Sequence, residues 1–187
     1  MKRIILASES PRRREILANT NINFIAKSSN IVEEFNKDIE IGLAIENIAL
    51  EKAKEVAKSY EEDIILGADT AVILDNEVLG KPQDEQEARE MLKKLSGKTH
   101  LVITGVAIID NSNIIKFHET SSVTFYELDD DIIDWYISTK DGFDKAGSYG
   151  IQGQGAILVK EIKGDYNNIV GLPIAKVYRT LLPLTEL

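Results

Sequence analysis

Three consecutive arginines stand in the first turn of a predicted helix, where acidic residues are usually favoured. Ser10-Pro11 predicts the start of this helix, because Ser is a good N-cap and Pro fits the first helical position. The positive end of the helix dipole then meets Arg12, Arg13 and Arg14. A helix N-terminus with arginines can bind phosphate oxygens, so we interpret the pattern as an anion site. The alternative is a solvated basic patch, which we expect for at least one of the three.

Lys52 falls on the apolar face of a helix predicted over about residues 39–60. With a helical advance of about 100° per residue, its neighbours on that face are Ile41, Ile45, Ile48 and Val56. The ammonium group either extends past the apolar wall to solvent or points at a buried anion. Spacing alone leaves both interpretations open, and extension to solvent is the commoner outcome.

Asp69 lies in Gly67-Ala68-Asp69-Thr70, directly after a strand predicted over residues 63–66. Catalytic side chains often stand where strands end at the edge of a sheet. An aspartate there could bind a divalent metal or activate a water molecule. The alternative is an Asx-type turn that stabilises the end of the strand, and the residues alone do not decide between the two.

Lys81 and Glu33 are weaker candidates. Gly80 and Pro82 would hold Lys81 in a rigid frame that suits a phosphate, although the motif by itself also fits a plain turn. Adjacent carboxylates such as Glu33-Glu34 are usually solvated. Glu33 becomes a metal ligand only if a second carboxylate lies nearby.

Several enzyme classes lack their motifs in this sequence. Residues 144–155 contain four glycines but precede a predicted strand, which excludes a dinucleotide-binding fingerprint. No GxxxxGK[ST] or HExxH motif occurs, and there is no cysteine to serve as nucleophile or metal ligand. The two histidines, His100 and His118, have no nucleophile elbow to join in a triad.

Composition limits the remaining classes. The 187 residues, 43% of them hydrophobic, suffice for one compact domain or for one domain split into two lobes. A net charge of −9 argues against non-specific nucleic-acid binding but leaves room for a small anionic ligand in a basic site. No apolar stretch has the length of a signal peptide core or a membrane span. The lack of cysteine fits a reducing cytoplasm.

The pattern of elements predicts a mixed sheet with flanking helices. Strands are predicted over 2–7, 63–66, 101–109, 114–126 and 156–162, with a hairpin over 71–79 that turns at Asp75-Asn76. Helices are predicted from Ser10-Pro11, over 39–60, 83–95 and 130–138, and from Pro173. Hairpins mixed with helices favour an α/β or α+β domain and not a doubly wound parallel sheet.

Six motifs, in order and in spacing, make the chain resemble the Maf family of nucleotide pyrophosphatases over nearly its whole length. The motifs are Leu6-Ala7-Ser8-x-Ser10-Pro11-Arg12-Arg13, Gly67-Ala68-Asp69-Thr70, Gly80-Lys81-Pro82, Leu95-Ser96-Gly97-x-x-His100, Asp144-Lys145-Ala146-Gly147 and Gly171-Leu172-Pro173. One departure is Asp141-Gly142-Phe143, where members often carry proline.

The resemblance implies a fold, a reaction and a set of roles. The fold would be that of the inosine-triphosphate pyrophosphatases: one domain over residues 1–187, with an elongated mixed sheet and two lobes around a cleft. The reaction would release pyrophosphate and a nucleoside monophosphate with help from Mg²⁺ or Mn²⁺, and the protein would be a homodimer.

The resemblance also implies roles for individual residues. Asp69 would accept a proton and bind metal together with Glu33. Phosphate contacts would come from Arg13, Lys52 and Lys81, and substrate specificity from Arg12, Thr70 and Gln152.

The segment from Tyr149 to Gly153 resembles the branch of the family that acts on dTTP and UTP. The Gln152 amide can match the N–H and a carbonyl of uracil or thymine, whereas cytosine would leave polar groups unpaired. Two other functions stay open: a nucleotide-binding regulator of septum formation with little turnover, and a house-cleaning enzyme for modified nucleotides.

Overall fold

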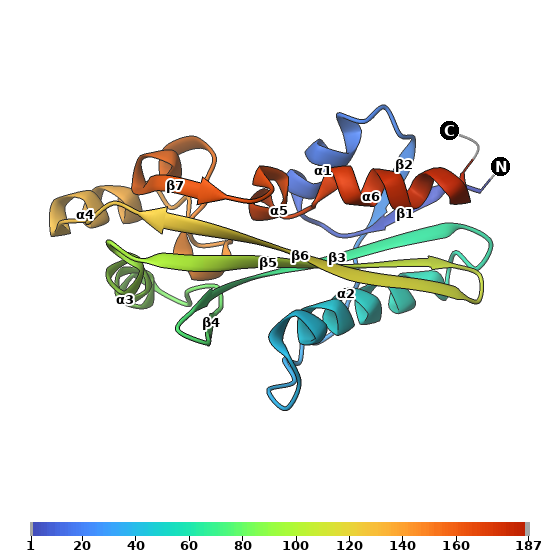
Figure 1. The fold of residues 1–187 in the computed structure, drawn as a ribbon, viewed down its shortest axis with the longest axis horizontal. Helices are drawn as coiled ribbons and strands as arrows, with labels where there is room; N and C mark the ends of the chain where they lie inside the picture. The colour runs from blue at the N-terminus through green and yellow to red at the C-terminus, as the bar shows by residue number, and fades with distance from the viewer. Residues whose placement is uncertain (1, 186–187) are drawn as a thin grey trace. The chain divides into compact units, whose positions relative to one another are not determined.

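The computed structural model describes residues 2–185, which form two compact units (Figure 1). The first unit contains the described residues of Met1–Asp69, Thr104–Glu119 and Gly171–Leu187. The second contains Thr70–Ile103 and Thr120–Val170. Each unit is discontinuous in sequence, so residues far apart along the chain become neighbours within it.

The strands form a seven-stranded mixed sheet, as predicted. They are β1 (Ile4–Ala7), β2 (Phe24–Lys27), β3 (Ile64–Leu74), β4 (Glu77–Leu79), β5 (Thr99–Asp110), β6 (Asn113–Phe125) and β7 (Val159–Lys163). The order is β2-β1-β3-β5-β6-β7, with β4 paired to β3. Strand β1 is parallel to β2 and β3, whereas the β3–β4 and β6–β7 pairs are antiparallel. Strands β3, β5 and β6 each contribute residues to both units.

The predicted helices are confirmed, with small shifts at their ends. They are α1 (Pro11–Ala18), α2 (Ile41–Ala57), α3 (Glu85–Leu95), α4 (Asp130–Ser138) and α6 (Ile174–Leu181). The sequence reasoning missed β2 and the short helix α5 (Tyr166–Val170). Residues 156–158, predicted as strand, belong to a 3₁₀ helix over Gly153–Leu158, and another 3₁₀ turn covers Ala146–Ser148.

The prediction that a strand ends before Gly67-Ala68-Asp69-Thr70 is wrong, because β3 continues through this motif to Leu74. What ends there is the neighbouring strand: β1 stops at Ala7, opposite Gly67. Asp69 therefore lies two residues beyond the parallel ladder, inside a continuous strand. The Asx-turn alternative required a strand exit and is wrong for the same reason.

In the first unit, α2 packs on one face of β1, β3 and β5, below β3 in Figure 1. The contacting side chains form one buried cluster of Ile5, Ala7, Ala49, Ala53, Val56, Ile65, Ala107 and Ile109. The approach of α2 to β3 is closest at Gly67, where an added Cβ would lie 2.2 Å from the Ala49 carbonyl oxygen. Only glycine permits this approach, which fixes α2 against β3.

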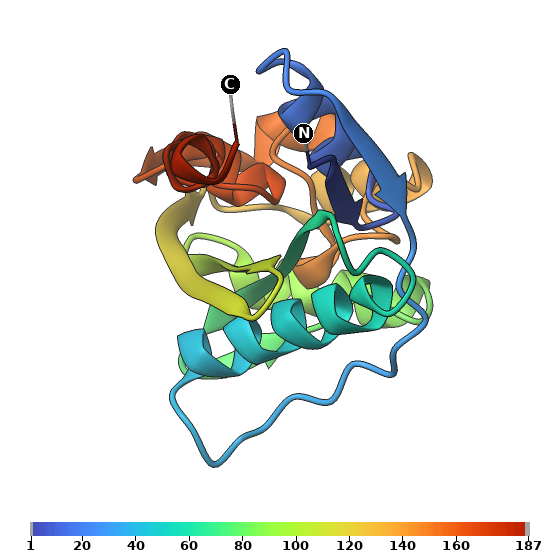
Figure 2. The same ribbon diagram turned by 90° about the vertical axis from the view of Figure 1, so that its right-hand side faces the viewer.

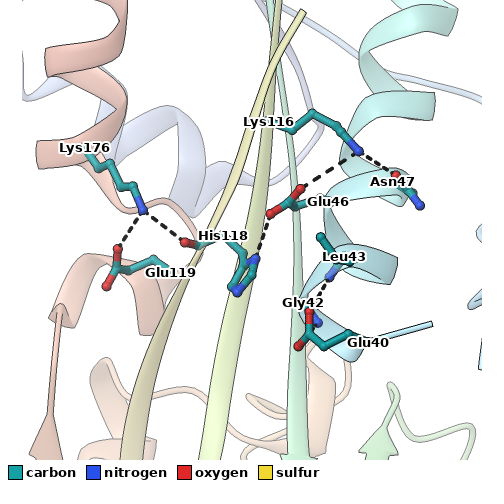
Figure 3. A network of polar contacts seen from close by, with 9 residues as sticks. All are labelled: Glu40, Gly42, Leu43, Glu46, Asn47, Lys116, His118, Glu119 and Lys176. Carbon is teal, nitrogen blue, oxygen red and sulfur yellow. Dashed lines mark hydrogen bonds and ion pairs between the residues drawn. The ribbon is translucent and has the colours of Figure 1, made fainter.

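Polar contacts join the N-terminal half of α2 to β6 and α6 (Figure 3). The buried carboxylate of Glu46 is 2.7 Å from Nδ1 of His118, and it forms a longer ion pair of 3.9 Å with Lys116. Lys176 donates a 3.2 Å hydrogen bond to the backbone carbonyl of His118. A buried carboxylate is stable only when it is paired, so this network supports the orientation of α2.

The second unit has its own core, built from β4, α3, α4, α5 and parts of β3, β5 and β6, with β7 packed against it. Its members include Val72, Leu92, Phe125 and Tyr136. The predicted hairpin is confirmed: Asp75 and Asn76 adopt φ values of 52° and 66° between β3 and β4. These left-handed residues give a turn whose twist matches the strands.

Candidate active site

The ammonium group of Lys52 lies between two carboxylates. Its Nζ is 2.6 Å from Oδ1 of Asp69 and 2.7 Å from Oε1 of Glu33. Lys52 and Asp69 are buried, with 8% and 9% of their surfaces exposed, whereas the Glu33 side chain is 54% exposed. The interpretation of Lys52 as a side chain that extends to solvent is therefore wrong, because its charge is held inside the first unit.

Three different segments bring these groups together. Lys52 comes from α2 and Asp69 from β3, which pack closely at Gly67. Glu33 comes from the long connection between β2 and α2, which has no regular structure over residues 28–40 and follows α2 on its outer side (Figure 2). Glu33 is thus the more exposed of the two carboxylates. The sequence allowed Glu33 as a metal ligand only if a second carboxylate lay nearby, and Asp69 is that second carboxylate.

The start of α1 supplies further positive charge to the first unit. Ser10 caps α1 by accepting a 3.4 Å hydrogen bond from the backbone N–H of Arg13. The Arg13 guanidinium donates to the carbonyl of Gly171 at 2.8 Å and to Oγ of Ser8 at 3.4 Å. Arg14 is exposed, as expected for at least one of the three arginines.

The electrostatics of Arg13 place it near the carboxylates. Burial lowers the pKa of its guanidinium; the negative charge of Asp69 opposes that shift, Arg12 adds to it, and Glu33 opposes it. Arg13 therefore interacts with both carboxylates, and the interpretation of all three arginines as a solvated patch is wrong. Arg13 is half-buried, and its guanidinium remains protonated and serves as a fixed positive charge.

This cluster in the first unit can bind an anion and orient a nucleophile. It combines two carboxylates with three cations: Glu33, Asp69, Arg12, Arg13 and Lys52. The cations can neutralise phosphate oxygens, and a carboxylate can accept a proton from water. Within residues 2–185, no group of three or more His, Cys, Asp or Glu side chains could hold a metal ion by itself. A metal at this cluster would need further ligands from substrate or water.

Three predicted site residues belong to the second unit. Thr70 follows Asp69 in β3 and is half-buried. Lys81 is exposed in the connection between β4 and α3, and Gln152 is exposed in the glycine-rich segment. The contribution of these three residues to substrate binding stays a prediction.

Sequence reasoning assigned no role to Ser8 or Gly171, the partners of Arg13. Gly171 has a φ of 131°, which favours glycine, and its carbonyl accepts the 2.8 Å hydrogen bond from Arg13. Both residues lie inside the quoted motifs, but nothing in a linear sequence shows that residues 8, 13 and 171 meet.

None of the helices in residues 2–185 combines the length and apolarity needed to cross a membrane.

The sequence matches a family of known proteins almost from end to end. The model of a family described as Maf-like protein matches residues 3–184. A dTTP/UTP pyrophosphatase of Bacillus cytotoxicus is 51% identical over 181 residues, which cover 97% of this chain and 95% of that protein. A dTTP/UTP pyrophosphatase of Pyrococcus furiosus shows the same identity and the same coverage.

Solved structures are more distant. A HAM1 protein from Coxiella burnetii aligns with a TM-score of 0.49 and 18% identity, over 67% of this chain and 73% of that one. This structural similarity is too low to support an inference beyond what the sequence relatives show.

Proposed function

The chain belongs to the Maf family, and we propose that it hydrolyses dTTP and UTP to the nucleoside monophosphate and pyrophosphate. The observation that supports the chemistry best is the meeting of Asp69 and Glu33 at the ammonium group of Lys52. The substrate class comes from relatives that share about half of the sequence and carry the name dTTP/UTP pyrophosphatase.

In the proposed reaction, Asp69 accepts the proton of a water molecule that attacks the α-phosphorus. Arg12, Arg13 and Lys52 neutralise phosphate oxygens, and pyrophosphate leaves from the opposite side. Positioning and charge stabilisation supply most of the rate enhancement in phosphoryl transfer. The buried position of Lys52, with 8% of its surface exposed, keeps its charge poorly screened by solvent and therefore effective.

The donor set of this cluster fits a divalent ion. Two carboxylate oxygens already lie within 2.7 Å of one cationic nitrogen, so they can share a cation. Mg²⁺ commonly uses one or two carboxylates and takes its other ligands from water and substrate phosphates. We propose that Asp69 and Glu33 hold Mg²⁺ or Mn²⁺ together with the triphosphate. When bound, the ion would offset phosphate charge and make water more acidic.

We further propose that Gln152 reads the base. Its amide offers one acceptor and two donors, which match the carbonyl and N–H of uracil and thymine. Arg12 and Thr70 would assist specificity, and Lys81 would contact phosphate, as the family motifs imply. A single methyl or hydroxyl difference is worth about 1–3 kcal/mol in a pocket, so both dTTP and UTP are expected substrates.

Pyrophosphate release tests the proposal directly. The purified protein is incubated with Mg²⁺ or Mn²⁺ and each common NTP and dNTP, with 7-methyl-GTP and modified pyrimidine nucleotides alongside. Release from dTTP and UTP, lost in Asp69→Asn, is the expected result. Stoichiometric binding without turnover would favour a nucleotide-binding regulator, and preference for a damaged base would favour a house-cleaning enzyme.

The remaining expectations stay predictions. They are a single Maf-like domain over residues 1–187, a homodimer and a cytoplasmic location. Sedimentation of the full chain would test the dimer, and fractionation of cells that produce the protein would test the location.

A further inference from the structure

His100 is a polar side chain enclosed by aromatic rings in the second unit. It lies on β5 with 1% of its surface exposed. Its ring makes edge contacts with Phe125 and Tyr149, at centroid distances of 5.1 and 5.3 Å. Phe125 and Tyr149 also meet edge-on at 4.7 Å, so each of the three rings contacts the other two.

The packing alone does not explain a histidine at this position. Burial lowers the pKa of His100 to about 4, so the ring is neutral at pH 7. Its Nδ1 has no hydrogen-bond partner, and leaving a buried polar atom unpaired destabilises the folded state. A phenylalanine would fill such a space without that cost. The polar contact that histidine gains in return is a 2.7 Å hydrogen bond between Nε2 and the hydroxyl of Tyr149.

Tyr149 introduces the segment that carries Gln152. The next residue, Gly150, donates its backbone N–H to the hydroxyl of Tyr136 at 3.1 Å. The segment then turns back on itself, since a Cβ on Gly155 would lie 1.9 Å from the Gly150 carbonyl oxygen. Two buried phenols therefore hold the start of this turn, and Gln152 follows with an exposed side chain.

We propose that His100 is a positioning residue for base selection, which acts through Tyr149 on the segment that presents Gln152. The inference rests on the proposed function, because it requires Gln152 to read the base. Discrimination between similar bases needs an amide held within about half an ångström of its hydrogen-bonding position. The His100–Tyr149 hydrogen bond fixes the residue at which the segment leaves the core, three positions before Gln152.

The test compares four variants in the full-length protein with Mg²⁺. Tyr149→Phe removes only the hydroxyl, His100→Leu removes its partner, and the double variant removes both. His100→Gln keeps a polar group near the position of Nε2. We measure kcat and KM for dTTP and dCTP, together with thermal unfolding. Thr124→Val is the control, since it removes another hydroxyl of the same unit, one that bonds Thr99 at 2.8 Å.

Tyr149→Phe and His100→Leu are expected to raise the KM for dTTP about tenfold, with kcat changed less than about twofold. The preference for dTTP over dCTP falls by a similar factor. His100→Gln restores most of the preference, and Thr124→Val leaves it unchanged. The double variant regains stability relative to His100→Leu, because no hydroxyl is left unpaired, but it does not regain the preference.

A purely structural role gives a different result. In that case the variants unfold at lower temperature while KM and the base preference stay at the wild-type values, and the inference is overturned. If the wild type releases no pyrophosphate, the proposed reaction fails, and calorimetric binding of dTTP and dCTP replaces turnover as the readout. Loss of the preference in binding still supports the role of His100. If the wild type binds neither nucleotide, both proposals are wrong.

Discussion

The ammonium nitrogen of Lys52 lies 2.6 Å from a carboxylate oxygen of Asp69, although the helix and the strand that carry them are separate elements. Both side chains are buried, so their charges interact in a medium of low polarity. Glu33 shares the same ammonium group at 2.7 Å. This arrangement determines what should happen when any one of the three charges is removed.

Asp69→Asn should abolish most turnover while the protein stays folded. Asparagine keeps the size of the side chain, and Lys52 keeps Glu33 as a charged partner. Loss of a general base typically lowers kcat by about 10²–10⁴-fold. Gln152→Leu is the comparison: it should act mainly on KM and base preference, because base contacts form before the transition state. Near-normal turnover in Asp69→Asn would show that the base is another group.

Lys52→Met should increase the affinity for Mn²⁺ in the absence of nucleotide, by about tenfold or more. The ammonium group occupies the space between two carboxylate oxygens, where it repels a second cation. The variant should also lose about 3 kcal/mol of stability, because a buried charge has lost its partner, and added Mn²⁺ should recover part of that loss. Electron paramagnetic resonance measures free Mn²⁺, and chemical unfolding measures stability.

Lys54→Met is the matched control for this experiment. Lys54 lies on the same helix, but it is exposed and its ion pair with Glu51, at 2.8 Å, is on the surface. Surface pairs contribute about 0–1 kcal/mol, so neither Mn²⁺ binding nor stability should change appreciably. Equal Mn²⁺ binding by Lys52→Met and Lys54→Met would contradict the position of the Lys52 ammonium group between the two carboxylates.

Gly67→Ala should destabilise the protein by about 3 kcal/mol. The new Cβ would lie 2.2 Å from the Ala49 carbonyl oxygen, and a backbone atom inside a helix cannot move alone. The strain would push α2 away from β3 and separate Lys52 from Asp69. Gly80→Ala is the control, because nothing lies within 4 Å of its added Cβ. Urea unfolding of both variants checks the prediction, which fails if they are equally stable.

Stability should fall as the pH is lowered from 6.5 towards 4, partly because of His100. Its pKa falls from an ordinary value of 6.5 to about 4 in the folded chain, so the unfolded chain binds more protons in this interval. The contribution is complete above pH 6.5 and is lost towards pH 4, and it amounts to about 3 kcal/mol. His100→Gln should lack this component. The free energy of unfolding at several pH values measures it, and parallel pH profiles for the two proteins would contradict it.

The local elements could be predicted because their signals are local. Ser10-Pro11 predicted the start of α1, and Asp75-Asn76 predicted the turn between β3 and β4, since both act through their own backbone conformations. The end of β3 was misplaced at Gly67, because glycine suggested an exit where it serves instead to admit the helix α2. Strand β2 was missed although β1 is equally short: β1 is buried at all four positions, whereas β2 alternates half-buried and exposed residues and so lacks a continuous apolar run.

The candidate site was predictable in part. The arginines of α1 were identified from a conflict between their charge and the helix dipole, which needs only the sequence. Lys52 in an apolar stripe left two orientations open, because spacing gives the face of a helix but not the direction of a long, flexible side chain. The linear pattern could not reveal that Ser8 and Gly171 hold Arg13, since contact across 158 residues depends on the folded chain.

The sequence by itself determined the family, the types of the main elements and the candidate residues, because motifs and periodicity are properties of the chain alone. Tertiary structure decided which charges meet. Lys52, Asp69 and Glu33 converge only because α2 packs onto β3 at Gly67 and the connection before α2 follows the helix. Tertiary structure also decided that His100 and Tyr149 are buried together and share a hydrogen bond, since burial depends on residues far apart in sequence. Packing is a property of the whole fold, and it gives each side chain its partner.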